Sequence, residues 1–432
     1  MRFMDKSAKS IHHVFNSYTH ILEQYADDAS FLWILRSNAV NQPHYYPYDL
    51  AELDQRIDAH LDGLMTAPEE SWDICEASLV LQQPGEVFVA AVLAFRSLDV
   101  RKIQIAVEAG LSNSHALKGL ISAMAWLPGR LVHSWIKKFL TSKDLDHKYL
   151  ALSVCSARRE DPREYLTAIL QRPDCLAHEK LHARALRLVG ELKRFDLISS
   201  LRNGTSAGDK TIQFWSTWSA ILMGKKSQIA NLQEWVITPN PLQRIAVELC
   251  FRVLSPEIAR DWVNRLAQNP VNQRTLIHAA GALGDPQAIN WMLSQMRVPA
   301  LTRLAGEAFA TITGIDLTSH KLVLEDIPEL DELLPDDGAQ NEEIEIGDDQ
   351  NLPFPDAAKI AAVWQKYQQR FAPGHRYFMG QMLSAAPQTI DHLTQVYKTG
   401  TQRQRAAAAL ELAVHQPNQF LLNHAAKETM DE

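Results

Sequence analysis

Cysteine is scarce in this sequence. Cys75, Cys155, Cys175 and Cys250 are the only four among 432 residues, and they lie far apart. No C-x-x-C motif or dense disulfide framework is present, which indicates buried thiols in a reducing compartment. An apolar signal-peptide region is also missing near Met1, and the apolar run at 87–95 is far shorter than the roughly 18 residues of a membrane-spanning helix. We therefore expect a cytoplasmic protein without a membrane partner.

An excess of positive charge is missing too. The formal net charge is -8 and the pI is near 6.1, whereas nucleic-acid-binding domains usually carry a basic stripe. We therefore expect no nucleic-acid partner, and a helical-repeat DNA-binding protein with a basic concave groove stays as an alternative. Asp and Glu crowd into the stretch 316–350 beside a single Lys, so the rest of the chain is close to neutral.

Strand signals are sparse, and helical periodicity runs through most of the chain. Three arginines, Arg244, Arg274 and Arg303, stand in register at spacings of 30 and 29 residues. A period near 30 with two helices per unit is typical of HEAT-like repeats. The predicted fold is therefore all-α, an α-solenoid of HEAT-like helix pairs. We expect the pairs at 86–110, 114–142, 147–172, 178–202, 211–237, 242–268, 272–297 and 301–314.

The clearest repeat unit predicts its own helix ends. Gly284 suits the left-handed conformation that closes a helix, Asp285 can cap the next helix, and Pro286 fits the first turn of that helix. Near the N-terminus, Asp49 is expected to cap a helix over 50–64. The turn signals thus agree with the helical periodicity.

Four regions are expected along the chain. They are an N-terminal helical cap at 1–85, a HEAT-like repeat array at 86–317, an acidic linker or insert at 318–353, and a C-terminal helical region at 354–432. The insert has two interpretations: it is a solvated flexible connection, or it is an acidic segment that attracts a basic surface of a partner. Helices are expected at 356–371, 390–398 and 402–414 in the last region.

Two short stretches match catalytic motifs but lack the neighbouring residues or secondary structure that those motifs require. The first, 178–182, reads H-E-x-x-H, in which His178 and His182 could hold zinc. Lys180 and Arg184 stand where that protease motif wants uncharged and apolar residues, so an ordinary repeat helix is favoured. The second, 204–208, reads G-x-S-x-G, but no strand precedes it, so we expect an inter-helix loop. No catalytic, metal or cofactor residue is therefore predicted, and no cofactor is expected.

The two ends of the chain and its last repeats carry a family resemblance. The matching strings are FLW (31–33), LDQRI (53–57), AHLDGL (59–64), RLAGEAF (303–309), ITGIDL (312–317), LPFPD (352–356), RFAPGHRY (370–377) and GTQRQR (400–405), together with Trp364. This pattern resembles an uncharacterised bacterial HEAT-repeat family encoded in type VI secretion gene clusters. The resemblance implies a role in assembly, loading or protection around a secretion apparatus, and it implies no enzymatic activity.

The expected function is that of a non-enzymatic protein-binding scaffold, an adaptor or chaperone for a type VI secretion component or effector. Its partners would be other proteins: a secretion spike, an effector or a toxin. An immunity protein that blocks a cognate toxin is one alternative, and an enzyme, either a zinc hydrolase or a repeat-type lyase, is another. The residues predicted to bind the partner are Trp364, Arg370, Phe371, Arg376, Tyr377, Gln402, Arg403 and Arg405.

The arginines and tryptophans leave further choices open. The register arginines could line an anion-binding groove, or bond to carbonyls and acids of the neighbouring repeat. Arg403 and Arg405 lie at the start of a predicted helix, where the dipole disfavours cations. They could meet the acidic insert or another protein, or be simply solvated. Most of the ten tryptophans are expected to pack between repeats, with one or two left as binding anchors.

Overall fold

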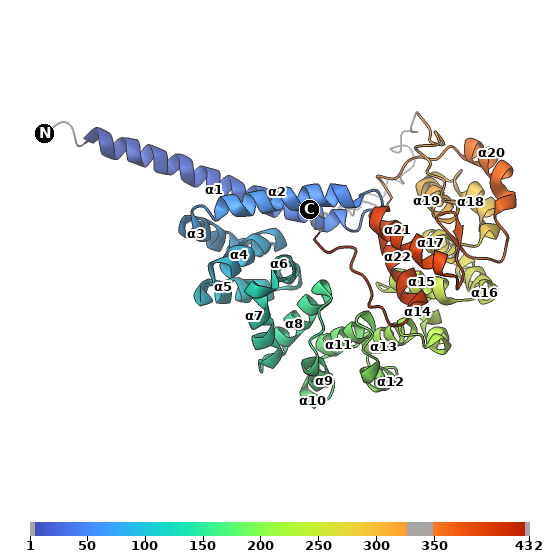
Figure 1. Cartoon of the computed structure of the whole chain (residues 1–432), viewed down its shortest axis with the longest axis horizontal. Helices are drawn as coiled ribbons and strands as arrows, with labels where there is room; N and C mark the ends of the chain where they lie inside the picture. Colours follow the sequence, from blue (N-terminus) through green and yellow to red (C-terminus); the bar gives the residue numbers. More distant parts are fainter. Residues whose placement is uncertain (1–4, 326–348, 428–432) are drawn as a thin grey trace. The chain divides into compact units, whose positions relative to one another are not determined.

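The computed structural model describes residues 5–325 and 349–427, with side chains from residue 18 onward. Most of these residues lie in helices that pack in sequential pairs, which confirms the predicted all-α class (Figure 1). The chain divides into two compact units. Unit 1 holds Met1–Asn41, Tyr45–Leu188 and Ala425–Glu432, and unit 2 holds Gln42–His44 and Val189–His424. This division falls inside the region predicted as one repeat array, so the four predicted boundaries stay predictions.

Unit 1 is built from helices that follow one another along the chain. They are α1 (Asp5–Ala39), α2 (Pro47–Leu64), α3 (Pro68–Ser78), the 3-10 turn η1 (Leu79–Leu81), α4 (Pro84–Ser97), α5 (Val100–Leu111), α6 (Ser114–Trp126), α7 (Gly129–Thr141), α8 (Leu145–Arg158), α9 (Glu164–Ile169), α10 (Pro173–Ala177) and the first part of α11 (Glu179–Glu191).

A buried ion pair joins α1 to α2, which lie side by side (Figure 1). Arg36 Nε lies 2.5 Å from Asp54 Oδ1, and the same guanidinium donates to the carbonyl oxygens of Ala425 and Ala426. Trp126 of α6 stacks on this guanidinium, with the ring centroid 5.4 Å from the cation. The last described residues of the chain are therefore held within unit 1 by hydrogen bonds to this buried guanidinium.

Unit 2 also consists of helices that follow one another along the chain, together with a small hairpin. Its elements are η2 (Phe195–Leu197), α12 (Ile198–Gly204), α13 (Lys210–Leu222), η3 (Lys226–Leu232), α14 (Gln233–Ile237), α15 (Gln243–Val253), α16 (Pro256–Ala267), η4 (Pro270–Asn272), α17 (Gln273–Leu283), η5 (Pro286–Ala288), α18 (Ile289–Gln295), η6 (Pro299–Leu301), α19 (Thr302–Thr313), α20 (Ala357–Tyr367), η8 (Gln368–Arg370), β1 (Tyr377–Phe378), β2 (Gln381–Met382), α21 (Pro387–Thr399) and α22 (Gln402–His415).

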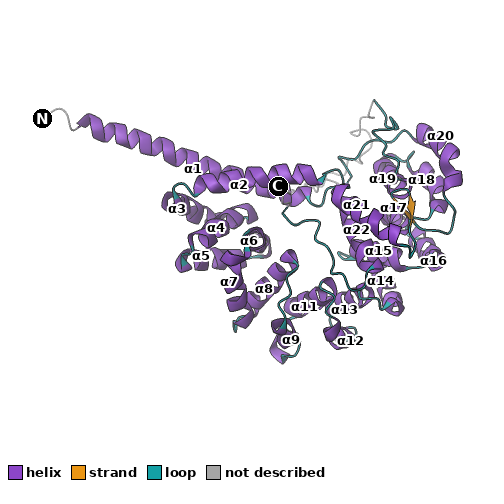
Figure 2. Cartoon of the chain, viewed as in Figure 1, coloured by secondary structure: helices purple, strands orange, loops and turns teal. Residues whose placement is uncertain are grey.

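Seven of the eight predicted helix pairs coincide with two helices each, whereas the range 301–314 holds the single helix α19. One local prediction was wrong, and one small element was not predicted. The helix expected to start after Asp49 starts at Pro47, because Asp49 accepts a hydrogen bond from the backbone N–H of Tyr46 inside the first turn instead of preceding it. The antiparallel pair β1–β2 was not predicted, since two-residue strands show no alternation to detect (Figure 2).

The acidic insert is described only at its two ends. The backbone N–H of Leu324 donates to the carbonyl oxygen of Phe354, and that of Asp356 donates to the carbonyl oxygen of Leu322. These bonds hold the start and the end of the insert together. Residues 326–348, which carry most of its acidic side chains, lie outside the described residues.

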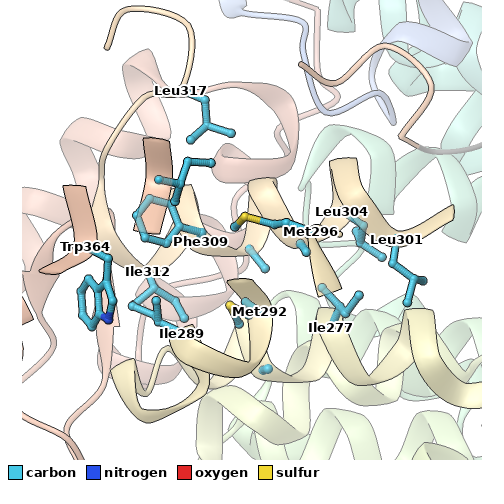
Figure 3. Close-up of a cluster of buried hydrophobic side chains, with 14 of the residues drawn as sticks. Ile277, Ile289, Met292, Met296, Leu301, Leu304, Phe309, Ile312, Leu317 and Trp364 are labelled. Atoms are coloured by element: carbon cyan, nitrogen blue, oxygen red, sulfur yellow. The ribbon is translucent and has the colours of Figure 1, made fainter. Parts of the chain in front are cut away.

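An apolar core runs through α17, α18, α19 and α20 (Figure 3). Phe309, Ile289 and Ile312 are fully buried, and Trp364 of α20 lies at one end of this cluster. Phe309 and Trp364 meet edge to face, with centroids 6.4 Å apart. The C-terminal region is thus part of the same core as the last repeats.

Gly284 and Gly314 each end a repeat helix in the left-handed conformation, with φ of 72° and 69°. The predicted caps at Gly284 and Asp285 are therefore confirmed. Both glycines also allow a close approach by residues 376–380, which we call the capping segment. A Cβ at Gly284 would lie 2.2 Å from the carbonyl oxygen of Tyr377, and one at Gly314 would lie 2.6 Å from that of Met379.

Among the described helices, none combines the length and the apolar character required to cross a bilayer.

We predict that Gly284→Ala lowers the free energy of unfolding by about 2–4 kcal/mol, because the methyl group adds left-handed strain and a clash with the capping segment. Urea denaturation followed by tryptophan fluorescence measures the loss. Gly208→Ala is the matched control, since no atom lies within 4 Å of its Cβ position. It should change the unfolding free energy by less than about 0.5 kcal/mol. Equal effects of the two substitutions would contradict the close packing at Gly284.

Candidate protein-binding site

Arg376, one of the predicted binding residues, lies at the C-terminal ends of two repeat helices. Its guanidinium donates to the carbonyl oxygen of Arg252 on α15 at 2.6 Å and to that of Leu283 on α17 at 3.1 Å. The residues after Arg376 make similar contacts. The backbone N–H of Tyr377 donates to the carbonyl oxygen of Gly284, and that of Met379 donates to the carbonyl oxygen of Thr311 on α19. The last carbonyls of a helix have no partner within the helix. The capping segment supplies partners for three helices in succession.

Arg376 also forms a buried ion pair. It contacts Glu411 of α22, whose side chain is 2% exposed, and Arg252 Nε lies 3.7 Å from the same carboxylate. Burial by itself raises the pKa of Glu411, but Arg376, His415 and Arg252 outweigh it and lower the pKa below its ordinary value. Glu411 is therefore charged, and its charge depends on the arginines that surround it.

Most of the other predicted binding residues are also buried inside unit 2. Trp364, Phe371 and Tyr377 belong to the apolar core, and Gln402 is 1% exposed. Arg405 is 4% exposed and donates to the carbonyl oxygen of Tyr397 at 2.9 Å, so its interpretation as a solvated charge is wrong.

Of the eight predicted residues, Arg370 is exposed. It lies beside the ring of Tyr367, with its cation 5.9 Å from the ring centroid. The side chain therefore reaches solvent at the end of α20.

The tryptophans are packed throughout. All ten fall within the described residues, and none is exposed; Trp33, Trp72, Trp126, Trp215, Trp218, Trp262 and Trp364 are buried, while Trp135, Trp235 and Trp291 are half-buried. The burial of seven of the ten agrees with the expectation that most of them pack between repeats. Trp135, Trp235 and Trp291 stay open as the one or two expected binding anchors.

Two of the three register arginines, Arg274 and Arg303, form hydrogen bonds with other segments of the chain. Arg274 donates to the carbonyl oxygen of Ala300, in the next repeat, at 3.0 Å and lies 2.6 Å from the carboxylate of Asp349. Arg303 donates to the carbonyl oxygen of Gln350. Bonding to the neighbouring repeat is thereby confirmed for Arg274, and the end of the acidic insert takes part as well.

A cluster of cations forms where the ladder meets α22. Arg244 of α15, Arg274 of α17 and Arg403 of α22 each act electrostatically on His278, and we call these three residues the arginine cluster. Burial, and then the three arginines, lower the pKa of His278 well below its ordinary value. Burial is thus the main reason why this histidine favours its neutral form, and the arginines add to the effect.

Two glutamates face the arginine cluster. Arg403 is paired with Glu307 of α19, so its partner is a repeat helix and not the insert. Burial raises the pKa of Glu307, and Arg403 and Arg244 oppose that effect. Glu248 of α15 lies near the cluster and pairs with Arg252.

Sequence reasoning missed His278 and Glu307, although a signal was present. Each follows a register arginine by four residues, His278 after Arg274 and Glu307 after Arg303. Residues four apart share a face of a helix. The same spacing relates Arg244 to Glu248, so the repeat register extends to a second polar position.

The two catalytic strings do not form the geometry of their motifs. His178 precedes α11 in extended conformation, and its Nδ1 accepts a hydrogen bond from the backbone N–H of Leu181. Residues 205–209 form the predicted loop between α12 and α13. Within the part of the chain that the structure describes, no group of three His, Cys, Asp or Glu side chains could hold a metal ion.

Lys193 links the C-terminal ends of α13 and α22. Its ammonium group donates to the carbonyl oxygen of Leu222 at the end of α13 and to that of Ala413 near the end of α22, the latter at 2.8 Å. The side chain is buried, and burial lowers its pKa from 10.5 to about 8. This lysine fixes α22, and with it Arg403, against the repeat helices.

The lowered pKa of Lys193 predicts a pH-dependent stability. Between pH 8 and 10.5 the unfolded chain binds more protons at this lysine than the folded chain does, so stability rises with pH. The free energy of unfolding of the wild type should increase relative to Lys193→Met by up to ~3 kcal/mol over this range. Denaturant titrations at several pH values measure the difference. Exposed Lys398→Met should show no such trend, and a difference that is flat or falls with pH would refute the expectation.

We predict that Arg376→Met lowers the free energy of unfolding by about 3–5 kcal/mol, because it leaves Glu411 buried without its closest cation. Removing both charges with Arg376→Met and Glu411→Leu together should recover part of the loss. Exposed Arg370→Met is the control, with an expected change below about 0.5 kcal/mol. Chemical denaturation of the four proteins tests the network, and a loss below about 1 kcal/mol for Arg376→Met would be incompatible with it.

No protein-family model, curated protein or solved structure matches the chain, so the arginine cluster is interpreted from its own residues and geometry.

Proposed function

We propose that the chain is a non-enzymatic protein-binding scaffold, an adaptor or chaperone for a component or effector of a type VI secretion system. The observation that carries the proposal is the row of arginines at the starts of successive helices. Arg274 of α17 forms an ion pair with Asp349, Arg403 of α22 forms one with Glu307, and Arg244 of α15 stands in the same register. Arginine forks suit the recognition of carboxylates on another protein.

The repeat architecture of the helical array is part of the same proposal. The array is a HEAT-like α-solenoid, in which each helix pair buries apolar surface against the next pair and leaves a repeating polar surface for a partner. The sequential packing and the register of Arg244, Arg274 and Arg303 at the starts of α15, α17 and α19 support this description. The resemblance of 303–317, 352–377 and 400–405 to the type VI secretion family supports the cellular context.

The predicted binding residues then divide into two groups. Arg370 contacts the partner through its exposed side chain, whereas Arg403 is paired with Glu307 and contributes charge beside it. The other six residues stabilise the structure beneath that surface. They are Trp364, Phe371, Arg376, Tyr377, Gln402 and Arg405.

A gene deletion in the bacterium that encodes the chain tests this function. We expect one effector or spike protein to disappear from the secreted fraction, measured by mass spectrometry, while the secretion apparatus still assembles. The same protein, purified, should form a complex with the full chain in size-exclusion chromatography. Restoring the wild-type gene should restore secretion.

Other outcomes would favour the alternatives. Neutralisation of a toxin by the chain, with secretion unchanged, would point to an immunity protein. Stoichiometric zinc in the purified chain, lost in His182→Ala, would point to a hydrolase. Unchanged secretion together with no complex would refute the scaffold proposal.

A further inference from the structure

One stretch of this acidic chain is purely basic. No Asp or Glu occurs from 109 to 143, whereas the same stretch contains Lys118, Arg130, Lys137, Lys138 and Lys143. It covers the helices α6 and α7 of unit 1 and the turns beside them (Figure 1). The net charge of the whole chain is -8, so this local excess has the opposite sign.

Helix α7 separates its apolar residues from its basic residues. Arg130, Lys137 and Lys138 are exposed, and we call these three residues the basic face of α7. Arg130 and Lys137 are seven residues apart, so they lie on the same side of the helix, two turns from each other. The side chains that α7 buries are apolar, namely those of Val132, Ile136, Phe139 and Leu140. The helix therefore buries its apolar side and leaves its cations in solvent.

The charge of the basic face is not matched by the described part of the chain. Among the described acids, Glu160 alone pairs with a residue of α7, namely with His133 at 3.0 Å. The same carboxylate also pairs with Arg158 at 2.9 Å. Arg130, Lys137 and Lys138 form no ion pair with any described residue. The three cations are therefore available to an external anion.

Trp135 lies beside the basic face. The Lys138 ammonium group lies 4.0 Å from the centroid of its ring, and the ring meets Phe95 of α4 edge to face, with centroids 6.2 Å apart. The indole is half-buried, so the core fixes one part of it while another part reaches solvent. Tryptophan and arginine are enriched among the residues that dominate the binding energy of protein interfaces. Trp135 can therefore anchor a partner that the cations attract.

The stability of α7 does not account for its charges. Like charges on one side of a helix repel each other. Arg130 is the second residue of α7, where the helix dipole disfavours a cation. Helix α16, by comparison, exposes charges of both signs, with Glu257, Asp261 and Arg265. The single sign of charge on α7 is better explained by a ligand of opposite charge.

We propose that the basic face of α7, with Trp135 beside it, docks an acidic segment of the partner protein. The proposal rests on the protein-binding function given above and adds the chemistry of the partner. Arg130 and Lys137 are separated by about 10 Å along the helix axis, since each residue of a helix rises about 1.5 Å. Asp or Glu side chains of the partner that recur at about this interval pair with the two cations. A neighbouring apolar side chain of the partner packs on the exposed part of Trp135.

A protein segment fits this face better than a nucleic acid or a lipid surface does. Proteins that bind nucleic acids usually neutralise several phosphates along a basic stripe, and a net charge of -8 repels such a polymer. Helices that lie on a membrane insert their apolar side into it, but the apolar side of α7 is buried within the protein. A small number of carboxylates on a protein matches a face of three cations.

Fluorescence anisotropy of a labelled oligo-glutamate peptide, titrated with the full chain, tests the proposal. Lys137→Gln alone should weaken binding by roughly 2- to 5-fold, the value of one exposed ion pair. The α7 variant combines Arg130→Gln, Lys137→Gln and Lys138→Gln, and it should weaken binding by about 10-fold or more.

The matched control combines Lys225→Gln, Lys226→Gln and Lys398→Gln, which are exposed lysines of unit 2. It removes the same charge as the α7 variant and should bind the peptide as the wild type does. Circular dichroism of each variant separates a loss of binding from a loss of folding. The proposal would be overturned by a wild type that does not bind the peptide, and equally by losses of the same size in the α7 variant and the control.

Two further ligands and one capture experiment complete the test. Tighter binding of a labelled single-stranded RNA or of phosphatidylserine vesicles than of the peptide, lost in the α7 variant, would overturn the proposal in favour of that ligand. If the chain captures its secretion partner and the α7 variant captures it equally well, the inference fails while the proposed function stands. Loss of capture in the α7 variant, with capture kept by the control, is the expected result.

Discussion

The C-terminal ends of the repeat helices impose the main constraint on unit 2. Their last carbonyls need donors, and the capping segment provides them from a part of the chain that follows the repeats. One guanidinium, that of Arg376, serves α15 and α17, and the backbone N–H groups that follow it serve the ends of α17 and α19. The left-handed glycines at the ends of α17 and α19 make room for this approach. The repeats and the C-terminal region therefore stabilise each other.

The opposite ends of the same helices carry the candidate site. Arginines at the second helical position are disfavoured locally, yet they occur on α15, α17, α19 and α22. The network that holds α22 in place, with Glu411 between Arg376 and Arg252 and with Lys193 at Ala413, also fixes the helix on which Arg403 reaches Glu307. Capping at one end of the helices thus positions charge at the other end.

Several features followed from local patterns. The helix pairs, the caps at Gly284 and Asp285 and the packing of most tryptophans were predicted because they depend on residues within one or two turns of helix. The hairpin β1–β2 and the exact start of α2 were not, since very short strands and first-turn hydrogen bonds leave little periodic signal. The candidate site was found only in pieces: the register arginines and Arg403 were noted separately.

By itself, the sequence determined the helical class, the repeat spacing and the position of each arginine along its helix, because these depend on neighbours close in the chain. Only the tertiary structure decided which of those side chains meet. Arg376 reaches Arg252 across 124 positions, and Arg403 reaches Glu307 across 96. Such contacts form when distant segments bury polar groups together, and the partners of a buried charge are chosen by packing, which no local pattern records.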